Sequence, residues 1–102
     1  VKVVTDLQQN AILFSRSVIP YQRDTSLTAH YFKHIGIYAF RRHLLLEFPF
    51  LTPGPLELLE KLEGNRFVEH AIPLKMVISD MQVIGIDTPE DLEKAQAYLQ
   101  NL

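Results

Sequence analysis

The sequence contains no cysteine and only four glycines. Without cysteine the chain has no disulfide framework, no thiolate metal site and no cysteine nucleophile, which fits a reducing compartment, so we expect a cytoplasmic protein. The glycines are scattered and match neither GxGxxG nor GxxxxGK[ST]. The sequence therefore has no glycine-rich loop that would hold a nucleotide phosphate.

Long apolar runs and a strong charge imbalance are also absent. The longest apolar stretches, such as residues 44–46 and 71–74, are far shorter than the roughly 20 residues needed to cross a bilayer, so we expect no membrane span. Ten basic and twelve acidic residues give a net charge of -2, which provides no electrostatic basis for binding nucleic acid. The amino terminus has neither an initiator Met nor a signal peptide, so we expect the chain to begin within a longer protein.

With 102 residues and 47% hydrophobic content, the chain has the composition of one folded domain or part of one. Residues 1–5 and 11–15 are two β-rich runs that predict a hairpin, with Asn10 suited to the tight turn. Residues 16–28 are polar and predict a surface loop. Alternating apolar residues from 32 to 40 predict a strand.

Helical spacing dominates the second half of the chain. It predicts a short helix over residues 41–48 that Pro49 ends, and a second helix from Pro55. Gly64 and Asn65 are suited to ending that helix, whereas the apolar residues that follow are suited to extending it, so both boundaries remain open. Residues 73–78 predict a buried strand, residues 83–86 an extended approach, and residues 89–100 a helix capped by Thr88.

Three segments, read in this order and at this spacing, resemble the CMP-KDO synthetase family of bacterial sugar cytidylyltransferases. They are VKVV followed by ILFSRSVIPY, then KHIGIYAF, and finally IGIDTPEDLEKA. The resemblance covers essentially the whole chain but only the carboxy-terminal half of such an enzyme. It implies an α/β fold, the carboxy-terminal part of a three-layer nucleotidyltransferase (GT-A-like) domain with a mixed sheet and a β-hairpin dimerisation subdomain.

The family's reaction transfers CMP from CTP to the anomeric hydroxyl of 3-deoxy-manno-octulosonate (KDO), an acidic sugar. It releases pyrophosphate, uses Mg2+ and serves lipopolysaccharide biosynthesis. The resemblance implies this activity for a complete homodimeric enzyme, whereas we expect the 102 residues alone to be inactive. The family's triphosphate-binding loop and a second metal-binding aspartate have no counterpart in the chain.

The resemblance also implies site residues. Asp87, at the start of the last helix, matches a Mg2+ ligand, and Mg2+ is often bound by one or two carboxylates together with phosphates. Arg16, His34, Tyr38 and Glu63 match residues that bind the sugar. Residues 1–40 would then supply most of the sugar site, and residues 41–102 the metal-site aspartate.

Four of these five assignments have a structural alternative. An arginine after a strand is usually solvated, His34 and Tyr38 share one strand face as structural residues often do, and Asp87 is also suited to flanking the Thr88 cap.

Residues 64 and 65 depart from the family pattern. The family has Gln and Leu after the glutamate that matches Glu63, whereas this chain has Gly64 and Asn65. Loss of the Gln amide removes two donors and one acceptor from the expected sugar site. Two alternatives to KDO transfer therefore stay open: a cytidylyltransferase for another acidic sugar, and a catalytically silent oligomerisation or binding module.

The remaining histidines and serines indicate no other chemistry. His30, His43 and His70 lack the spacing of a zinc site. The serines lack the surroundings of a hydrolase nucleophile.

Overall fold

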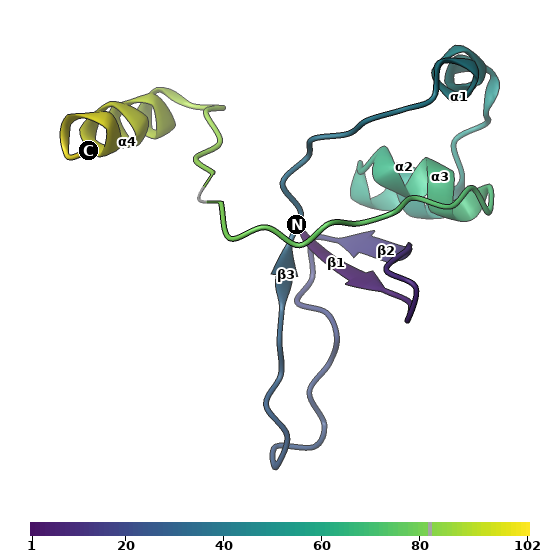
Figure 1. Ribbon diagram of the computed structural model, residues 1–102, viewed down its shortest axis with the longest axis horizontal. Coiled ribbons are helices and arrows are strands. Elements are labelled where there is room, and N and C mark those ends of the chain that lie inside the picture. Colours follow the sequence, from purple (N-terminus) through teal and green to yellow (C-terminus); the bar gives the residue numbers. More distant parts are fainter. Residues whose placement is uncertain (82) are drawn as a thin grey trace.

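The first two strands form the predicted hairpin. The computed structural model describes residues 1–81 and 83–102, and in it β1 (Lys2–Thr5) pairs antiparallel with β2 (Ala11–Ser15) (Figure 1). The left-handed residue of the turn is Gln9, with a φ of 69°, and not Asn10. The Asp6 carboxylate accepts hydrogen bonds from the backbone N–H groups of Gln8 and Asn10, both at 2.9 Å, and these bonds stabilise the turn.

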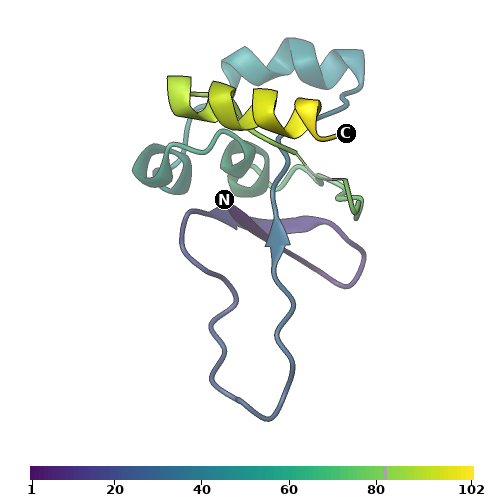
Figure 2. The same ribbon diagram turned by 90° about the vertical axis from the view of Figure 1, so that its left-hand side faces the viewer.

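The third strand is much shorter than the sequence predicts. β3 (Phe32–Lys33) pairs antiparallel with β1, so the sheet has the order β2-β1-β3. The predicted strand over residues 32–40 is wrong beyond Lys33, apart from one hydrogen bond from the His34 N–H to the Val1 carbonyl at 2.9 Å. Gly36 has a φ of 82°, outside the extended region, and it interrupts the strand. Residues 16–28 form a loop as predicted, and it extends away from the helices (Figure 2).

Four short helical elements follow β3. They are α1 (Arg42–Glu47), the 3-10 helix η1 (Phe48–Phe50), α2 (Pro55–Glu60) and α3 (Gly64–Glu69). The short helix predicted before Pro49 is confirmed, since α1 ends at Glu47, and Pro49 lies in the first turn of the separate η1, where a proline is tolerated. Neither boundary considered for the second helix is right. Lys61, with a φ of 57°, ends α2, and α3 starts separately at Gly64.

The core lies where α3 packs against the hairpin. Val3, Phe14 and Phe67 are the buried hydrophobic residues of the part of the chain that the structure describes. Glu57 is also buried, and it accepts two hydrogen bonds from the Arg66 guanidinium, at 2.8 and 2.6 Å. The helices α1 to α3 lie on one side of the sheet (Figure 2).

The chain then leaves this body as an extended arm. Leu74 and Met76 hydrogen-bond to the backbone of Ala11 and Gln9, at 2.9 and 2.7 Å. The predicted buried strand over residues 73–78 is nevertheless wrong: among the described residues the segment pairs with the hairpin at one isolated antiparallel bridge, between Asn10 and Lys75, and Val77 is 86% exposed.

Residues 83–86 lead into the final helix, α4 (Pro89–Gln100), as predicted. Thr88 and Asp91 form a capping box at its start. The arm carries α4 away from the other helices (Figure 1).

Candidate functional site

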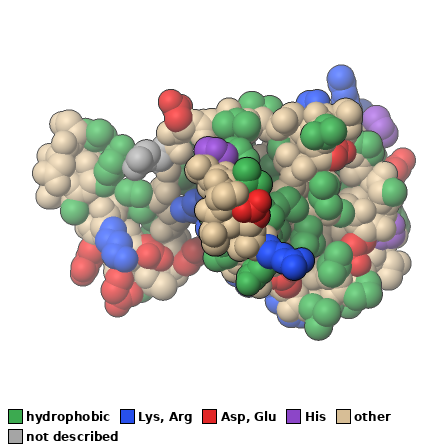
Figure 3. Space-filling model, turned by 90° about the horizontal axis from the view of Figure 1, so that it is seen from below, with side chains coloured by type: hydrophobic (Ala, Val, Ile, Leu, Met, Phe, Trp, Pro, Cys, Tyr) green, Lys and Arg blue, Asp and Glu red, His purple; other side chains and the backbone are tan. Residues whose placement is uncertain are grey.

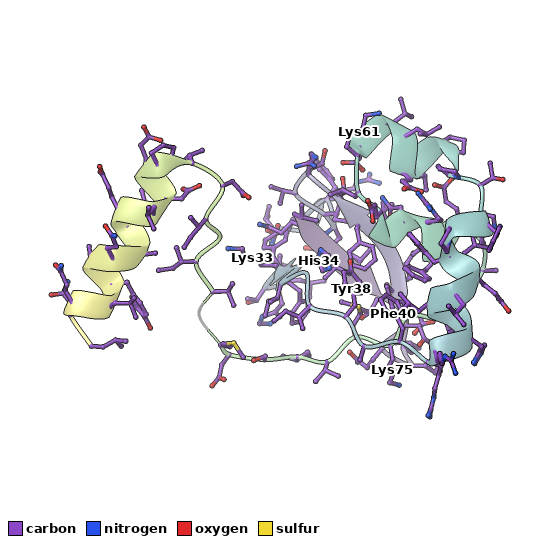
Figure 4. All side chains as sticks on the ribbon, turned by 90° about the horizontal axis from the view of Figure 1, so that it is seen from above. Lys33, His34, Tyr38, Phe40, Lys61 and Lys75 are labelled. Carbon is purple, nitrogen blue, oxygen red and sulfur yellow. The ribbon has the colours of Figure 1, made fainter. Side chains whose placement is uncertain are left out.

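His34 and Tyr38 form the centre of the site. They lie in the segment between β3 and α1, and the Tyr38 hydroxyl is 2.8 Å from His34 Nε2. The sequence predicts that the two side chains share one face of a strand. The backbone there is not a strand, and the two side chains are instead in direct contact. His34, Tyr38 and Phe40 follow one another toward α1 (Figure 4).

Burial determines the charge state of this pair. Burial lowers the pKa of His34 below its ordinary value, so the imidazole is neutral at neutral pH. Burial, followed by the negative charge of Glu63, raises the pKa of Tyr38, so the phenol keeps its proton. Two neutral groups that each donate or accept hydrogen bonds therefore lie side by side, which suits hydroxyl groups of a ligand.

A cavity of about 220 Å³ opens beside Tyr38. Glu63 lies in its wall and is the one charged residue among the described residues that line it; the others are Tyr38, Phe40, Leu45, Phe48, Gly64 and Phe67. Their aromatic rings stack in a row, with centroid distances of 5.7 Å for Tyr38 and Phe40, and 5.2 Å for Phe40 and Phe67. The cavity thus combines apolar ring faces with one carboxylate, a combination typical of small-molecule sites.

Arg16 does not line this cavity. Its Nε donates to the Glu60 carbonyl at 2.7 Å and its Nη2 to the Lys61 carbonyl at 3.3 Å. Its backbone N–H also donates to the Glu60 carboxylate at 2.8 Å. A cation at the carboxyl end of a helix interacts favourably with the helix dipole, so Arg16 stabilises the end of α2.

Asp87 lies on the arm, apart from the His34–Tyr38 pair and its cavity. Its backbone N–H donates to the Asp91 carboxylate at 3.2 Å, as part of the α4 cap. Its own carboxylate makes no hydrogen bond with a described residue. Residues 1–81 and 83–102 hold no cluster of three or more metal-ligating side chains, so Asp87 alone offers an incomplete metal site.

Sequence reasoning missed three residues that shape the site. Asn65 is completely buried and binds the backbone of Phe14, while Arg66 pairs with Glu57 and its guanidinium lies 4.3 Å from the centroid of the Phe48 ring. A polar pair among the apolar residues of α3 is the one local signal for these contacts. The Phe14 partner of Asn65 lies 51 positions away and the Glu57 partner of Arg66 nine positions away, so the signal does not identify them.

Comparisons with known proteins agree with the resemblance drawn from the sequence. The family model described as cytidylyltransferase matches residues 1–78. A 3-deoxy-manno-octulosonate cytidylyltransferase of Flavobacterium johnsoniae is 52% identical over 102 residues, which are all of this chain and 42% of the relative. One from Christiangramia forsetii is 50% identical over 99 residues, 97% of this chain and 40% of the relative.

A solved structure has the same fold as this chain. It is a CMP:2-keto-3-deoxy-manno-octonic acid synthetase complexed with CTP, 40% identical to this chain, with a TM-score of 0.90. The match covers 99% of this chain and 42% of that one. The chain thus spans about 40% of the length of the relatives it matches. Within the described residues, no helix is long and apolar enough to cross a membrane.

Proposed function

Because this chain belongs to the cytidylyltransferase family, we propose that it forms the sugar-binding side of an enzyme that transfers CMP from CTP to KDO. The observation that carries the proposal is the hydrogen-bonded pair of His34 and Tyr38 beside the cavity that Glu63 lines. The 52% identity to a relative named for this reaction supports the choice of substrate. A complete enzyme would join the anomeric oxygen of KDO to the α-phosphorus of CTP and release pyrophosphate.

The residues of the cavity have distinct roles in this proposal. The Glu63 carboxylate accepts hydrogen bonds from sugar hydroxyls, and the His34–Tyr38 pair hydrogen-bonds further hydroxyls. The ring faces of Phe40 and Phe67 exclude water from the apolar side of the sugar. Together these contacts hold the sugar in one orientation for attack, and orientation of this kind accounts for a large part of many rate enhancements.

Arg16 remains a candidate for the sugar carboxylate. Two of its five N–H groups are used on the carbonyls of Glu60 and Lys61. Its Nη1 makes no hydrogen bond with a described residue. The α2 carbonyls would hold the guanidinium in place while Nη1 binds the carboxylate.

Asp87 fits one position of a Mg2+ site. Its carboxylate is exposed, and the neighbouring Asp91 carboxylate is already used by the N–H groups of Asp87 and Thr88. Mg2+ is commonly bound by one or two carboxylates together with phosphates and water, so a single aspartate from this chain is chemically sensible. When bound, the metal would neutralise charge on the phosphates of CTP.

The exposed arm indicates where the remainder of such an enzyme would pack. The radius of gyration is 16.1 Å, compared with about 13 Å for a compact domain of 100 residues. Val77 and Ile78 on the arm are 86% and 66% exposed, and other hydrophobic side chains are spread over the surface (Figure 3). We propose that the rest of a three-layer GT-A-like domain with a mixed sheet covers this arm.

The assembly and cellular context are also proposals. The family resemblance implies a homodimer with a β-hairpin dimerisation subdomain, a cytoplasmic location and a role in lipopolysaccharide biosynthesis. Among the described residues β3 is an edge strand of the order β2-β1-β3, which is compatible with an interface there.

A different acidic sugar is the second candidate substrate. Gly64 has no side chain and the Asn65 amide is used on the backbone of Phe14, so neither replaces the amide that the family pattern supplies after Glu63. A sialic acid is an acidic sugar whose polar groups are arranged differently from those of KDO, and it is therefore the alternative substrate.

The test uses a chimeric enzyme, defined as the Flavobacterium johnsoniae relative in which this chain replaces the matching segment. With CTP and Mg2+, we expect pyrophosphate release with KDO and not with N-acetylneuraminate. Glu63→Gln and Tyr38→Phe should each raise the KM for the sugar and leave the KM for CTP unchanged. Activity with N-acetylneuraminate alone would favour the second candidate. No activity with either sugar, in a folded chimeric enzyme, would favour a silent module.

A further inference from the structure

Asn65 makes an unusual contact with the edge of the sheet. β2 is an outer strand of the order β2-β1-β3, and its residue Phe14 has a completely buried side chain. The Phe14 N–H donates to Asn65 Oδ1 at 3.0 Å, and Asn65 Nδ2 donates to the Phe14 carbonyl at 3.0 Å. One side chain thus satisfies both backbone groups of Phe14, as a neighbouring strand would.

This contact fixes the first turn of α3. Asn65 is the second residue of α3 and is itself completely buried, so its side chain has no alternative partner in water. The side chain at residue 65 must supply both a donor and an acceptor, because the two backbone groups of Phe14 are of opposite kind. The start of α3 therefore has one position relative to β2.

The same turn forms a wall of the cavity. Gly64 precedes Asn65, and a Cβ built on Gly64 would lie 2.9 Å from Phe14 Cε2 and 2.9 Å from the Tyr38 hydroxyl. Glu63, one residue earlier, lines the cavity together with Gly64 and Tyr38. The position of α3 along β2 thus sets how far the Glu63 carboxylate lies from Tyr38.

We propose that Asn65 is a positioning residue for the sugar site: by pairing with Phe14 it holds Glu63 and Gly64 in register with Tyr38. This inference rests on the proposed function. The family pattern has an apolar Leu at residue 65. In this chain, Asn65 would affect sugar binding without contacting the sugar. Asn65 is buried behind the cavity wall, whereas Glu63 and Tyr38 line the cavity.

The test compares Asn65→Leu and Asn65→Asp with the control Asp6→Ala in the chimeric enzyme. The Asp6 carboxylate also makes two hydrogen bonds to backbone N–H groups, but it does so in the β1–β2 turn and does not line the cavity. We expect Asn65→Leu to raise the KM for the sugar at least tenfold, with the KM for CTP within twofold of wild type. Asn65→Asp keeps the acceptor for the Phe14 N–H and should show a smaller increase.

Asp6→Ala should lower the unfolding temperature and leave both KM values unchanged. The inference is overturned if Asn65→Leu changes only the unfolding temperature, or if it raises both KM values together. If Asn65→Leu does not fold, the KM for the sugar and the KM for CTP are compared in Asn65→Asp instead, with the same criteria. Should the wild-type chimeric enzyme act on no acidic sugar, the proposed function fails. The NMR signal of the His34 ring then tests the inference, and an unchanged signal in the Asn65 variants overturns it.

Discussion

Replacing Gly64 with alanine tests the packing between α3 and the site. In open space at a helical position, this change would stabilise the fold by at most about 1 kcal/mol, because alanine favours the helix over glycine. The added Cβ would, however, meet Phe14 Cε2 and the Tyr38 hydroxyl at 2.9 Å each. Carbon atoms in good contact lie about 3.5 to 4.0 Å apart, so the overlap is about 0.6 Å or more.

The two neighbours differ in their freedom to move. The Tyr38 hydroxyl is the end of a side chain and can shift, whereas the Phe14 ring is 0% exposed and its backbone is held by Asn65. Overpacking of this kind typically costs about 1 to 3 kcal/mol, which outweighs the helical gain. We therefore expect a net loss of about 1 kcal/mol, or about 2 to 4 °C in the unfolding temperature of a domain of 150 to 250 residues.

The assay is thermal unfolding of the chimeric enzyme. If Gly64→Ala were as stable as wild type or more stable, the close packing of α3 against Phe14 would be refuted.

Three further predictions concern the metal, pH and assembly. Asp87→Asn in the chimeric enzyme should lower turnover roughly 100-fold or more, because it removes one charge from the metal site. The unfolding temperature should not change. Normal pyrophosphate release by this variant would contradict the metal assignment. Burial lowers the pKa of His34 in the folded chain. As the pH falls below about 6.5, the unfolded chain therefore takes up a proton at this residue before the folded chain does. The free energy of unfolding then decreases between about pH 6.5 and the lowered pKa of the folded chain. Unfolding temperatures measured between pH 8 and 5 should therefore fall more in wild type than in His34→Gln, and equal slopes would refute this. We also expect the chimeric enzyme to self-associate, and sedimentation as a monomer at high micromolar concentration would count against that.

Sequence reasoning succeeded where the determining interactions are local. The hairpin follows from two β-rich runs and a short turn between them. The final helix follows from Thr88, Pro89 and Asp91, which form its cap within four residues.

It failed where a segment depends on distant partners. The alternating pattern of residues 32–40 predicts a strand, but β1 pairs only with its first residues and Gly36 turns the backbone away. Residues 73–78 pair with the hairpin at one bridge, between Asn10 and Lys75, and the described part of the chain supplies no further strand that would bury their side chains.

The same limit applies to the site. Arg16 binds carbonyls at residues 60 and 61, 44 and 45 positions away, and Asn65 binds Phe14 across 51 positions. No local pattern identifies such pairs. The cavity that Tyr38 and Glu63 share arises in the same way, because the residues that line it come from separate segments of the chain.

The most direct test of the central claim, that this chain is the sugar-binding side of a cytidylyltransferase, is pyrophosphate release from a mixture of two separate polypeptides. One is the 102-residue chain, and the other is the remaining part of the Flavobacterium johnsoniae relative, both supplied with CTP, Mg2+ and KDO. We predict no release from either polypeptide alone, because one lacks the triphosphate-binding loop and the other lacks the sugar cavity, and we predict release when they are mixed. Activity from the 102-residue chain alone, or a folded complex of the two that releases no pyrophosphate, would contradict the account.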